Sequence, residues 1–166
     1  ITVGAQYLTE SESDNSGIDG SIAGVMVEAG IGSLTLAGAY NNVSVDDGKS
    51  IFEGFGGGSS YTNIDTNTAG FLHDGTSGDG ESYVLSVGYE IADTNIFAAY
   101  GDYKADALAN GTGKQHATEI NLGAEHSYND GQIEAALYYV IGEDKESSIV
   151  TDKDDNHIRL TLNYNF

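Results

Sequence analysis

The sequence predicts an all-β fold, a transmembrane antiparallel up-and-down β-barrel, from three observations. The last ten residues alternate strictly between apolar and polar side chains and end on Phe166. Similar alternating runs recur along the chain with turn residues between them. Short and long connections between these runs also alternate, which is typical of outer-membrane barrels with tight turns on the periplasmic side and long loops outside.

Eight strands are expected, and the last one shows the pattern most clearly. Ile158, Leu160 and Leu162 share one face of that strand, whereas polar residues occupy the other. A strand that crosses lipid beside a wet lumen needs this alternation over about 9–11 residues. The expected strands are 1–9, 20–30, 33–44, 81–91, 95–104, 117–129, 132–142 and 157–166. Short connections are expected at 30–33, 92–95 and 129–132, and long external loops at about 10–19, 45–80, 105–116 and 143–156.

Two of the short connections predict how their strands pair. Asp130-Gly131 is typical of a two-residue type I′ turn, and residues 30–33 form a similar signal. In strand 95–104 we expect Phe97, Ala99 and Tyr103 to face outward, because this keeps Asp102 off the lipid. The predicted pairs are Tyr128 with Ile133, His126 with Ala135, Ala124 with Leu137, Ala29 with Leu34 and Val27 with Leu36.

Composition limits the function classes. The chain has 166 residues, enough for a single barrel domain, and no cysteine, which excludes disulfides and thiolate zinc sites. Its 26 acidic against 6 basic residues give a net charge of −20, which argues against nucleic acid as a partner and favours cations. No apolar run approaches the 18 residues of a membrane helix. The chain begins within a strand-like run without Met or a signal peptide, so we expect a piece of a longer chain.

The alternation assigns residues to a lipid side and a lumen side. Aromatic side chains are expected in two belts at the lipid interfaces, and polar side chains on the opposite face are expected to line a pore, although solvated polar residues of a wide lumen would look the same. The expected belts contain Tyr89, Phe97, Tyr128, Tyr164 and Phe166 at the inner ends and Tyr7, Tyr40, Tyr83 and Tyr103 at the outer ends. The pore-lining candidates are Glu90, Glu119, Asn121, Glu125, Glu134, Arg159 and Asn163.

The 45–80 connection is longer than the ordinary loops of a compact domain, which predicts that it has a function. It either folds into the barrel mouth as a constriction or forms an external loop packed on its own aromatic residues. Acid-rich stretches at 74–79 and 152–156 could hold adventitious calcium, but the four histidines have no metal-ligand spacing, and no cofactor or resident metal is expected. The constriction candidates are Asp46, Asp47, Glu53, Asp65, Asp74 and Asp79.

Residues 61–71, 80–90, 96–103 and 159–166 together resemble the OprD-type porins, most closely the major outer membrane porins of epsilonproteobacteria. The resemblance covers about residues 50–166. It implies an 18-stranded barrel that admits small solutes, often cationic ones, across a bacterial outer membrane, and a terminal Phe166 that the barrel assembly machinery recognises. Because the chain supplies only eight strands, it is expected to be the C-terminal part of a larger barrel or a small barrel of the same ancestry.

The predicted function is therefore a passive, cation-favouring diffusion channel for small cationic or neutral solutes. It would lie among outer-membrane lipids and lipopolysaccharide, and a homotrimer is a candidate assembly because strands 20–30 and 33–44 are apolar on both faces. The alternatives are a closed eight-stranded barrel with a structural, anchoring or adhesive role, and a soluble acidic β-sandwich. The chain has no nucleophile elbow, HExxH helix or phosphate loop, so an enzyme is not expected.

Overall fold

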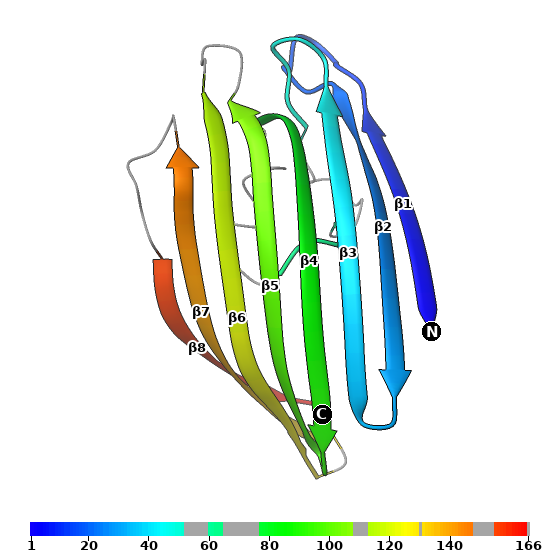
Figure 1. Cartoon of the computed structure of the whole chain (residues 1–166), viewed down its shortest axis with the longest axis vertical. Helices are drawn as coiled ribbons and strands as arrows, with labels where there is room; N and C mark the ends of the chain where they lie inside the picture. The colour runs from blue at the N-terminus through cyan, green and yellow to red at the C-terminus, as the bar shows by residue number, and fades with distance from the viewer. Residues whose placement is uncertain (52–59, 65–76, 108–112, 130, 148–154, 166) are drawn as a thin grey trace.

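The computed structural model describes residues 1–51, 60–64, 77–107, 113–129, 131–147 and 155–165, and its strands form one antiparallel sheet (Figure 1). Each strand pairs with the next along the chain, which confirms an all-β, up-and-down fold. None of the described segments forms a helix long and apolar enough to cross a membrane. The strands are β1 (Thr2–Glu10), β2 (Gly20–Ile31), β3 (Leu34–Val45), β4 (Ser77–Ile91), β5 (Thr94–Ala107), β6 (Lys114–Tyr128), β7 (Ile133–Ser147) and β8 (Asp155–Tyr164).

All eight expected strands are present, but several extend further at the ends that meet the long connections. β5 continues to Ala107, β6 begins at Lys114, and β7 continues to Ser147. The extensions of β6 and β7 are polar on both faces, so they carry no alternating signal, and that of β5 adds only Ala-Asp-Ala. The backbone ladder does not require that signal, because it joins amide and carbonyl groups whatever the side chains are.

The two kinds of connection lie at opposite ends of the sheet. The three tight turns between β2 and β3, β4 and β5, and β6 and β7 lie at one end, at the bottom of Figure 1. The four long connections start and finish at the other end, as the alternation of short and long connections predicts. One end of the sheet is therefore compact, and the long connections leave and rejoin the sheet at the other.

The predicted pairing is confirmed at one turn and wrong at another. Tyr128 pairs with Ile133, and the two further pairs predicted between β6 and β7 are also present. At the β2–β3 turn, however, Ile31 pairs with Leu34 and Ala29 pairs with Leu36, two residues away from the prediction. The left-handed residue is Gly32, with φ of 60°, so β2 continues through Gly30 to Ile31. A shift of two residues leaves every side chain on its predicted face.

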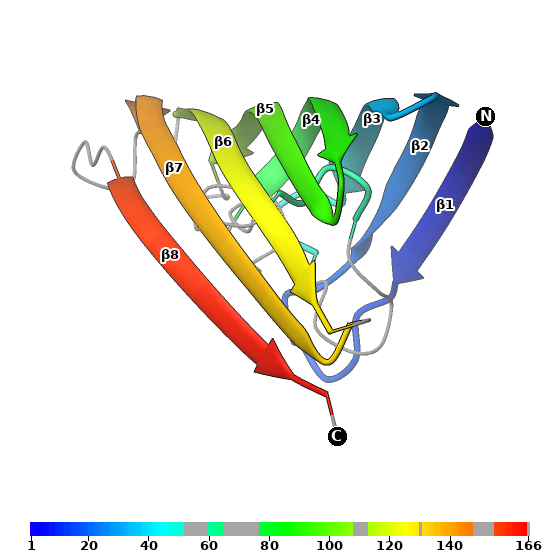
Figure 2. The same ribbon diagram turned by 90° about the horizontal axis from the view of Figure 1, so that it is seen from below.

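The sheet curls into a trough with a concave and a convex face (Figure 2). It does not close on itself: among the described strands, β1 and β8 each have a neighbour on one side only. The eight strands therefore do not form the small closed barrel of the alternative prediction. Among the described strands, β1 and β8 are therefore the two edges of the sheet.

The polarity of the sheet is the reverse of that of a soluble protein. The exposed large hydrophobic residues, of which Leu85 (58 % exposed) and Leu160 (65 %) are examples, all alternate onto the convex face. In contrast, polar residues such as Asn41 (0 %), Ser82 (1 %) and Glu119 (0 %) are buried on the concave face. A contiguous apolar surface of this extent indicates contact with another apolar phase or partner.

Buried apolar packing among the described residues is limited to two small clusters, and both include residues of the 45–80 connection. Ile22 and Val43 on the concave face pack against Ile51. Ile64 packs against a second cluster formed by Val84, Tyr103 and Ala105. The first cluster gives the apolar inner faces of β2 and β3 a packing partner within the chain itself.

Candidate functional site

The predicted pore-lining residues all lie on the concave face. The ladder places Glu125 opposite Ala136 and Ser127 opposite Glu134, so the two carboxylates are diagonal neighbours on one wall, as predicted. Pairing across β4 to β8 places the remaining candidates on the same wall: Glu90, Glu119, Asn121, Arg159 and Asn163. The sheet thus brings polar groups from four strands, β4, β6, β7 and β8, to one surface.

This surface is strongly acidic. Arg159 is the only lysine or arginine that the described strands place on the concave face, whereas Lys104, Lys114 and Lys145 lie on the convex face. An acidic wall of this kind raises the local concentration of cations. Among the strand residues whose side chains the structure describes, the acidic residues on the concave face are Glu10, Glu28, Glu90, Glu119, Glu125, Glu134 and Asp144.

Near the tight turns, the concave face contains a hollow of about 500 Å³ whose lining includes Glu90, Glu125, Glu134 and Arg159. The Tyr138 hydroxyl donates a hydrogen bond to Oε1 of Glu125 (2.6 Å), and the Arg159 guanidinium lies 4.6 Å from the centre of the Tyr138 ring. The Tyr138 side chain therefore contacts both the Glu125 carboxylate and the Arg159 guanidinium. The carboxylates of Glu90 and Glu134 line the same hollow. The hollow can attract cations without enclosing them.

The facing predicted for β5 is wrong. Phe97, Ala99 and Tyr103 lie on the concave face, because Phe97 pairs with Gly88 of β4 and Gly123 of β6. Asp102 therefore faces the convex side, where its carboxylate contacts the His116 ring (3.0 Å) and the Lys104 ammonium (3.3 Å). The reasoning failed because Asp102 lies in the polar extension of the sheet beyond the apolar band, where outward charge is compensated.

Two aromatic rings of β5 fold over glycines on the concave face. A Cβ on Gly101 would lie 2.5 Å from the Tyr103 hydroxyl and 2.6 Å from its ring, and a Cβ on Gly123 would collide with the Phe97 ring. Phe97 also lies 5.4 Å from Tyr138, centre to centre. Glycine inside a strand often marks such close approach, so Gly101 and Gly123 are the signal that could have located these rings.

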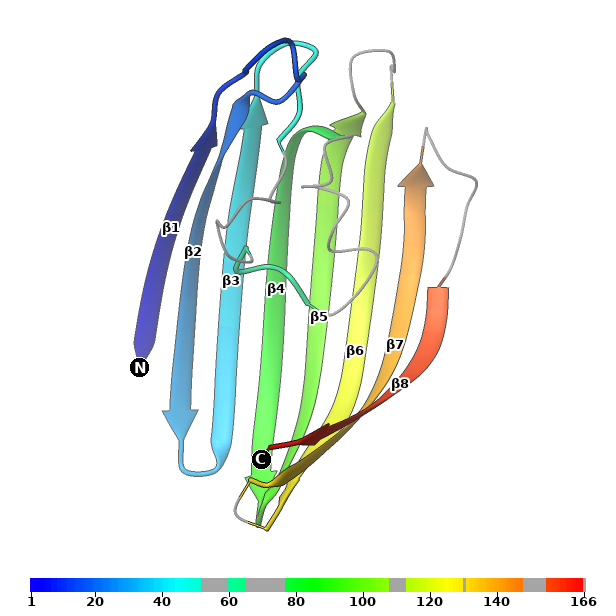
Figure 3. The same cartoon turned by 180° about the vertical axis from the view of Figure 1, so that it is seen from behind.

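Residues 60–64, here called the strap, lie on the concave face across β3, β4 and β5 (Figure 3). The Tyr103 hydroxyl donates to the Thr62 carbonyl (2.7 Å), and the Thr62 and Ser82 hydroxyls lie 2.7 Å apart. This part of the 45–80 connection therefore folds against the sheet rather than standing outside it. The finding favours the first of the two alternatives for this connection.

The acidic constriction candidates that the structure describes are not part of the strap. Asp46 and Asp47 lie in an exposed turn after β3, which the Lys49 amide closes by donating to the Asp46 carbonyl (2.9 Å). Asp79 is exposed at the start of β4 and accepts from the Val45 amide (2.7 Å). Asp46 and Asp47 therefore follow the end of β3, and Asp79 lies at the start of β4, so their role in a constriction stays a prediction. Glu53, Asp65 and Asp74 lie outside the described residues.

On the convex face, tyrosines mark the limits of the apolar band. Tyr40 pairs with Tyr83, whose ring lies 6.1 Å from that of Tyr100. Beyond this row towards the long connections, the outward residues become polar. Phe97 and Tyr103 are absent from the belts for the reason given above, and Phe166 lies outside the described residues. The outer row is Tyr7, Tyr40, Tyr83 and Tyr100; the row near the tight turns is Tyr89, Tyr128 and Tyr164, beside His126, which bonds Thr94 (2.7 Å).

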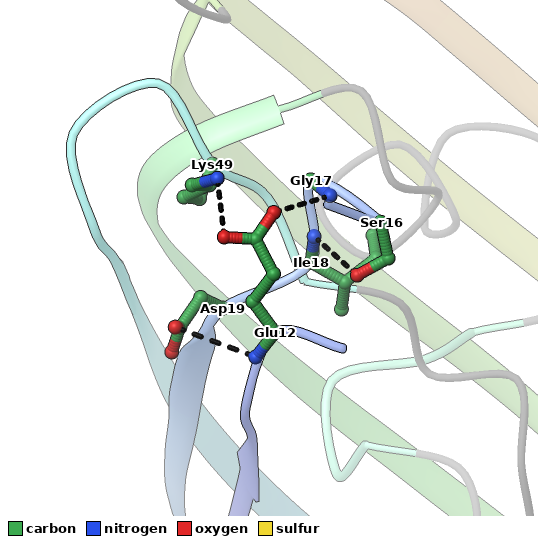
Figure 4. A network of polar contacts seen from close by, with 6 residues as sticks. All are labelled: Glu12, Ser16, Gly17, Ile18, Asp19 and Lys49. Carbon is green, nitrogen blue, oxygen red and sulfur yellow. Dashed lines mark hydrogen bonds and ion pairs between the residues drawn. The ribbon is translucent and has the colours of Figure 1, made fainter. Parts of the chain in front are cut away.

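At the end with the long connections, the β1–β2 loop is tied to the start of the 45–80 connection (Figure 4). The Lys49 ammonium pairs with Oε2 of Glu12 (2.6 Å), and the Gly17 amide donates to Oε1 of the same carboxylate (3.0 Å). The hydrogen bond from Lys49, followed by that from Gly17, holds the pKa of Glu12 below its ordinary value. Backbone bonds from Asp19 and Ser50 complete this junction.

No protein-family model, curated protein or solved structure matches the chain. The resemblance to OprD-type porins therefore stays a prediction, and the assignment of function depends on the geometry described above.

Within the described ranges, no group of three or more His, Asp or Glu side chains converges as metal ligands would. Most of the two stretches considered for calcium, 74–79 and 152–156, lies outside those ranges. The side chains that the described strands place on the concave face include carboxylates, amides, hydroxyls, the His157 ring and the Arg159 guanidinium.

Proposed function

We propose that the chain forms part of the wall of an outer-membrane diffusion channel that favours cations and small cationic or neutral solutes. The observation that carries this proposal is the reversed polarity of the sheet. Apolar side chains cover the convex face between two rows of tyrosines, and carboxylates line the concave face. A barrel wall between lipid and a wet lumen requires this arrangement.

The dimensions of the apolar band support the same proposal. On β4, outward apolar residues run from Tyr83 to Ile91 and rise about 26 Å along the strand. A membrane barrel strand crosses the hydrocarbon with about 9–11 residues at a tilt near 45°. The flanking tyrosines match the aromatic girdles at the two lipid interfaces.

The open edges support membership of a larger barrel. Unpaired backbone groups cost several kcal/mol each in hydrocarbon, so a sheet in a bilayer has to continue until it closes. The outward residues of the edge strand β8 are among the most exposed, with Ile158 at 71 % and Leu162 at 67 %. We propose that further strands, beyond those of this chain segment, cover β1 and β8.

Conductance in planar bilayers tests the channel. The expected result is stepwise conductance with a reversal potential that favours cations. A cation about 10 Å from a carboxylate gains about 0.4 kcal/mol in water. The double variant Glu125→Gln/Glu134→Gln should therefore lower cation preference about 1.5-fold at 0.1 M salt, where screening is strong, and up to about fourfold at low salt.

For the single variant Glu125→Gln, the matched control is Glu143→Gln, which removes one carboxylate charge from the convex face of β7. It should leave the reversal potential unchanged. Equal effects of Glu143→Gln and the lumen variants would show that only net charge matters, and the assigned faces would then be irrelevant to selectivity.

A second candidate is a barrel that does not conduct and serves as an anchor or adhesin through its acidic loops. The strap favours this reading, since residues 60–64 occupy part of the concave face. Absence of conductance steps from protein that is stably inserted in the bilayer would support it over the channel.

A further inference from the structure

The least expected feature of the concave face is the way the strap is attached to it. Ser60 is 4 % exposed and Thr62 is fully buried, although both are polar. The strap makes a tight turn in which the Asn63 amide donates to the Ser60 carbonyl (3.0 Å). The strap contacts the sheet through hydrogen bonds of Thr62 and through apolar packing of Ile64.

Three strands share the attachment. Ser82 of β4 bonds the Thr62 hydroxyl, and Tyr103 of β5 bonds the Thr62 carbonyl, each at 2.7 Å. Towards β1, a Cβ on Gly4 would lie 2.8 Å from the Tyr61 hydroxyl, so the Tyr61 side chain reaches the first strand. Thr62 is the point where a side chain and a backbone group of the strap are both held.

Tyr103 can reach the Thr62 carbonyl only because its ring lies flat over its own strand. Gly101, two residues earlier on the same face, leaves room for the ring, and the side chain is fully buried. Ile64 packs against the same tyrosine. Tyr103 thus combines an apolar contact with the strap and a hydrogen bond to it, and no other described residue does both.

The wall beneath and beside the strap is polar. Asn41 pairs with Ser82 in the ladder and is fully buried, and Asn121 is 2 % exposed. Within the described part of the chain, neither amide atom of Asn41 has a hydrogen-bond partner. Such groups are stabilised by water, so wetting of this wall would compensate for detachment of the strap. Water can therefore replace the polar part of the attachment, whereas the packing of Ile64 on Val84 and Tyr103 would be lost.

We propose that Tyr103 is a positioning residue that fastens the strap to the wall, and that this fastening sets the open width of the passage along the concave face. The inference rests on the proposed channel function and adds a means of regulating it. When the bond from Tyr103 to Thr62 is made, the strap narrows the passage. When that bond is lost, the strap leaves the wall and the polar groups beneath it become wet.

The first test is Tyr103→Phe in the full chain, measured by single-channel recording. The change removes one hydroxyl and keeps the ring over Gly101. Loss of one buried hydrogen bond should raise the population of the unfastened state about fivefold, seen as longer or more frequent high-conductance events. The control is Tyr139→Phe, which removes a hydroxyl from the convex face of β7 and should leave the recordings unchanged.

A cross-link gives the reverse experiment. The chain has no cysteine, so Thr62→Cys/Ser82→Cys introduces a single pair at side chains that already touch. Oxidation should form the disulfide readily, which a change in gel mobility reports without any conductance measurement. Placed in the Tyr103→Phe background, the oxidised pair should restore the wild-type conductance, and reduction should release it again.

The outcomes are distinct. If every variant is inserted but none conducts, the channel proposal fails, and the cross-linking yield still reports whether the strap is fastened as described. If the disulfide forms and the Tyr103→Phe protein conducts like wild type in both redox states, the positioning role is refuted while the channel stands. If the disulfide fails to form in folded protein, the strap does not lie on Ser82 and the inference is overturned.

Discussion

The assignment of the convex face to lipid can be tested with one arginine. Val87 lies at the centre of the outward band on β4, four residues from both Tyr83 and Ile91. That separation is about 13 Å along the strand, or about 10 Å in depth at a tilt near 40°. Val87 is therefore close to the bilayer midplane if the band spans the hydrocarbon.

The substitution Val87→Arg should destabilise the folded protein in lipid by about 2–4 kcal/mol, whereas Ile91→Arg at the band edge should cost about 0–1 kcal/mol. The matched control is Ser86→Arg, the adjacent residue on the concave face. Urea titration of the protein in lipid vesicles measures the free energy of unfolding. In a water-soluble protein, arginine at the 40 % exposed Val87 would change stability by no more than about 0.5 kcal/mol. A Val87→Arg protein as stable as wild type would refute the lipid-facing assignment.

Three further predictions concern loops, glycines and turns. The pKa of Glu12 is lowered in the folded protein, so its carboxylate stabilises the junction with Lys49 above the ordinary pKa and loses this effect as the pH falls through the folded pKa. Protection of the Gly17 amide from hydrogen exchange should therefore persist at pH 5 and decrease once the pH is below about 4.5. In Glu12→Gln this protection should no longer depend on pH. Gly101→Ala should displace Tyr103 and cost about 1–3 kcal/mol in urea titration, whereas Gly30→Ala, with nothing within 4 Å of its Cβ, should be near neutral; equal costs would contradict the ring-over-glycine contact. Ala92 has φ of 49° in the β4–β5 turn, so Ala92→Gly should stabilise the protein by about 0.5–1 kcal/mol, and a loss of stability would argue against this turn geometry.

Most of the sheet was predictable because its pattern is local. A two-residue period needs only neighbouring side chains, so the faces of β6, β7 and β8 follow from the sequence. β5 was assigned wrongly because both of its faces contain apolar residues and the choice depended on Asp102. The faces of β5 are determined by its pairing with β4 and β6, which no local sequence pattern reveals.

The site divides in the same way. The placement of Glu125 and Glu134 on one face follows from the two-residue period and the turn type alone. The strap does not, because its position depends on contacts between residues that are 20 and 41 positions apart in the chain. The polar groups of the strap resemble those of any loop, and their partners can be recognised only once Tyr103 is known to lie on the concave face. The face of Tyr103 was itself predicted wrongly.

The long connections all leave the sheet at one end, and this arrangement affects how the proposed channel wall would insert into a bilayer. An approach from the periplasm would require the loops that hold Glu12, Asp14, Asp46 and Asp47 to traverse hydrocarbon, while the tight turns stay behind. Ionised carboxylates oppose that crossing. Unassisted insertion into vesicles should therefore be slow, and its rate would report the charge of the loops rather than the stability of the sheet.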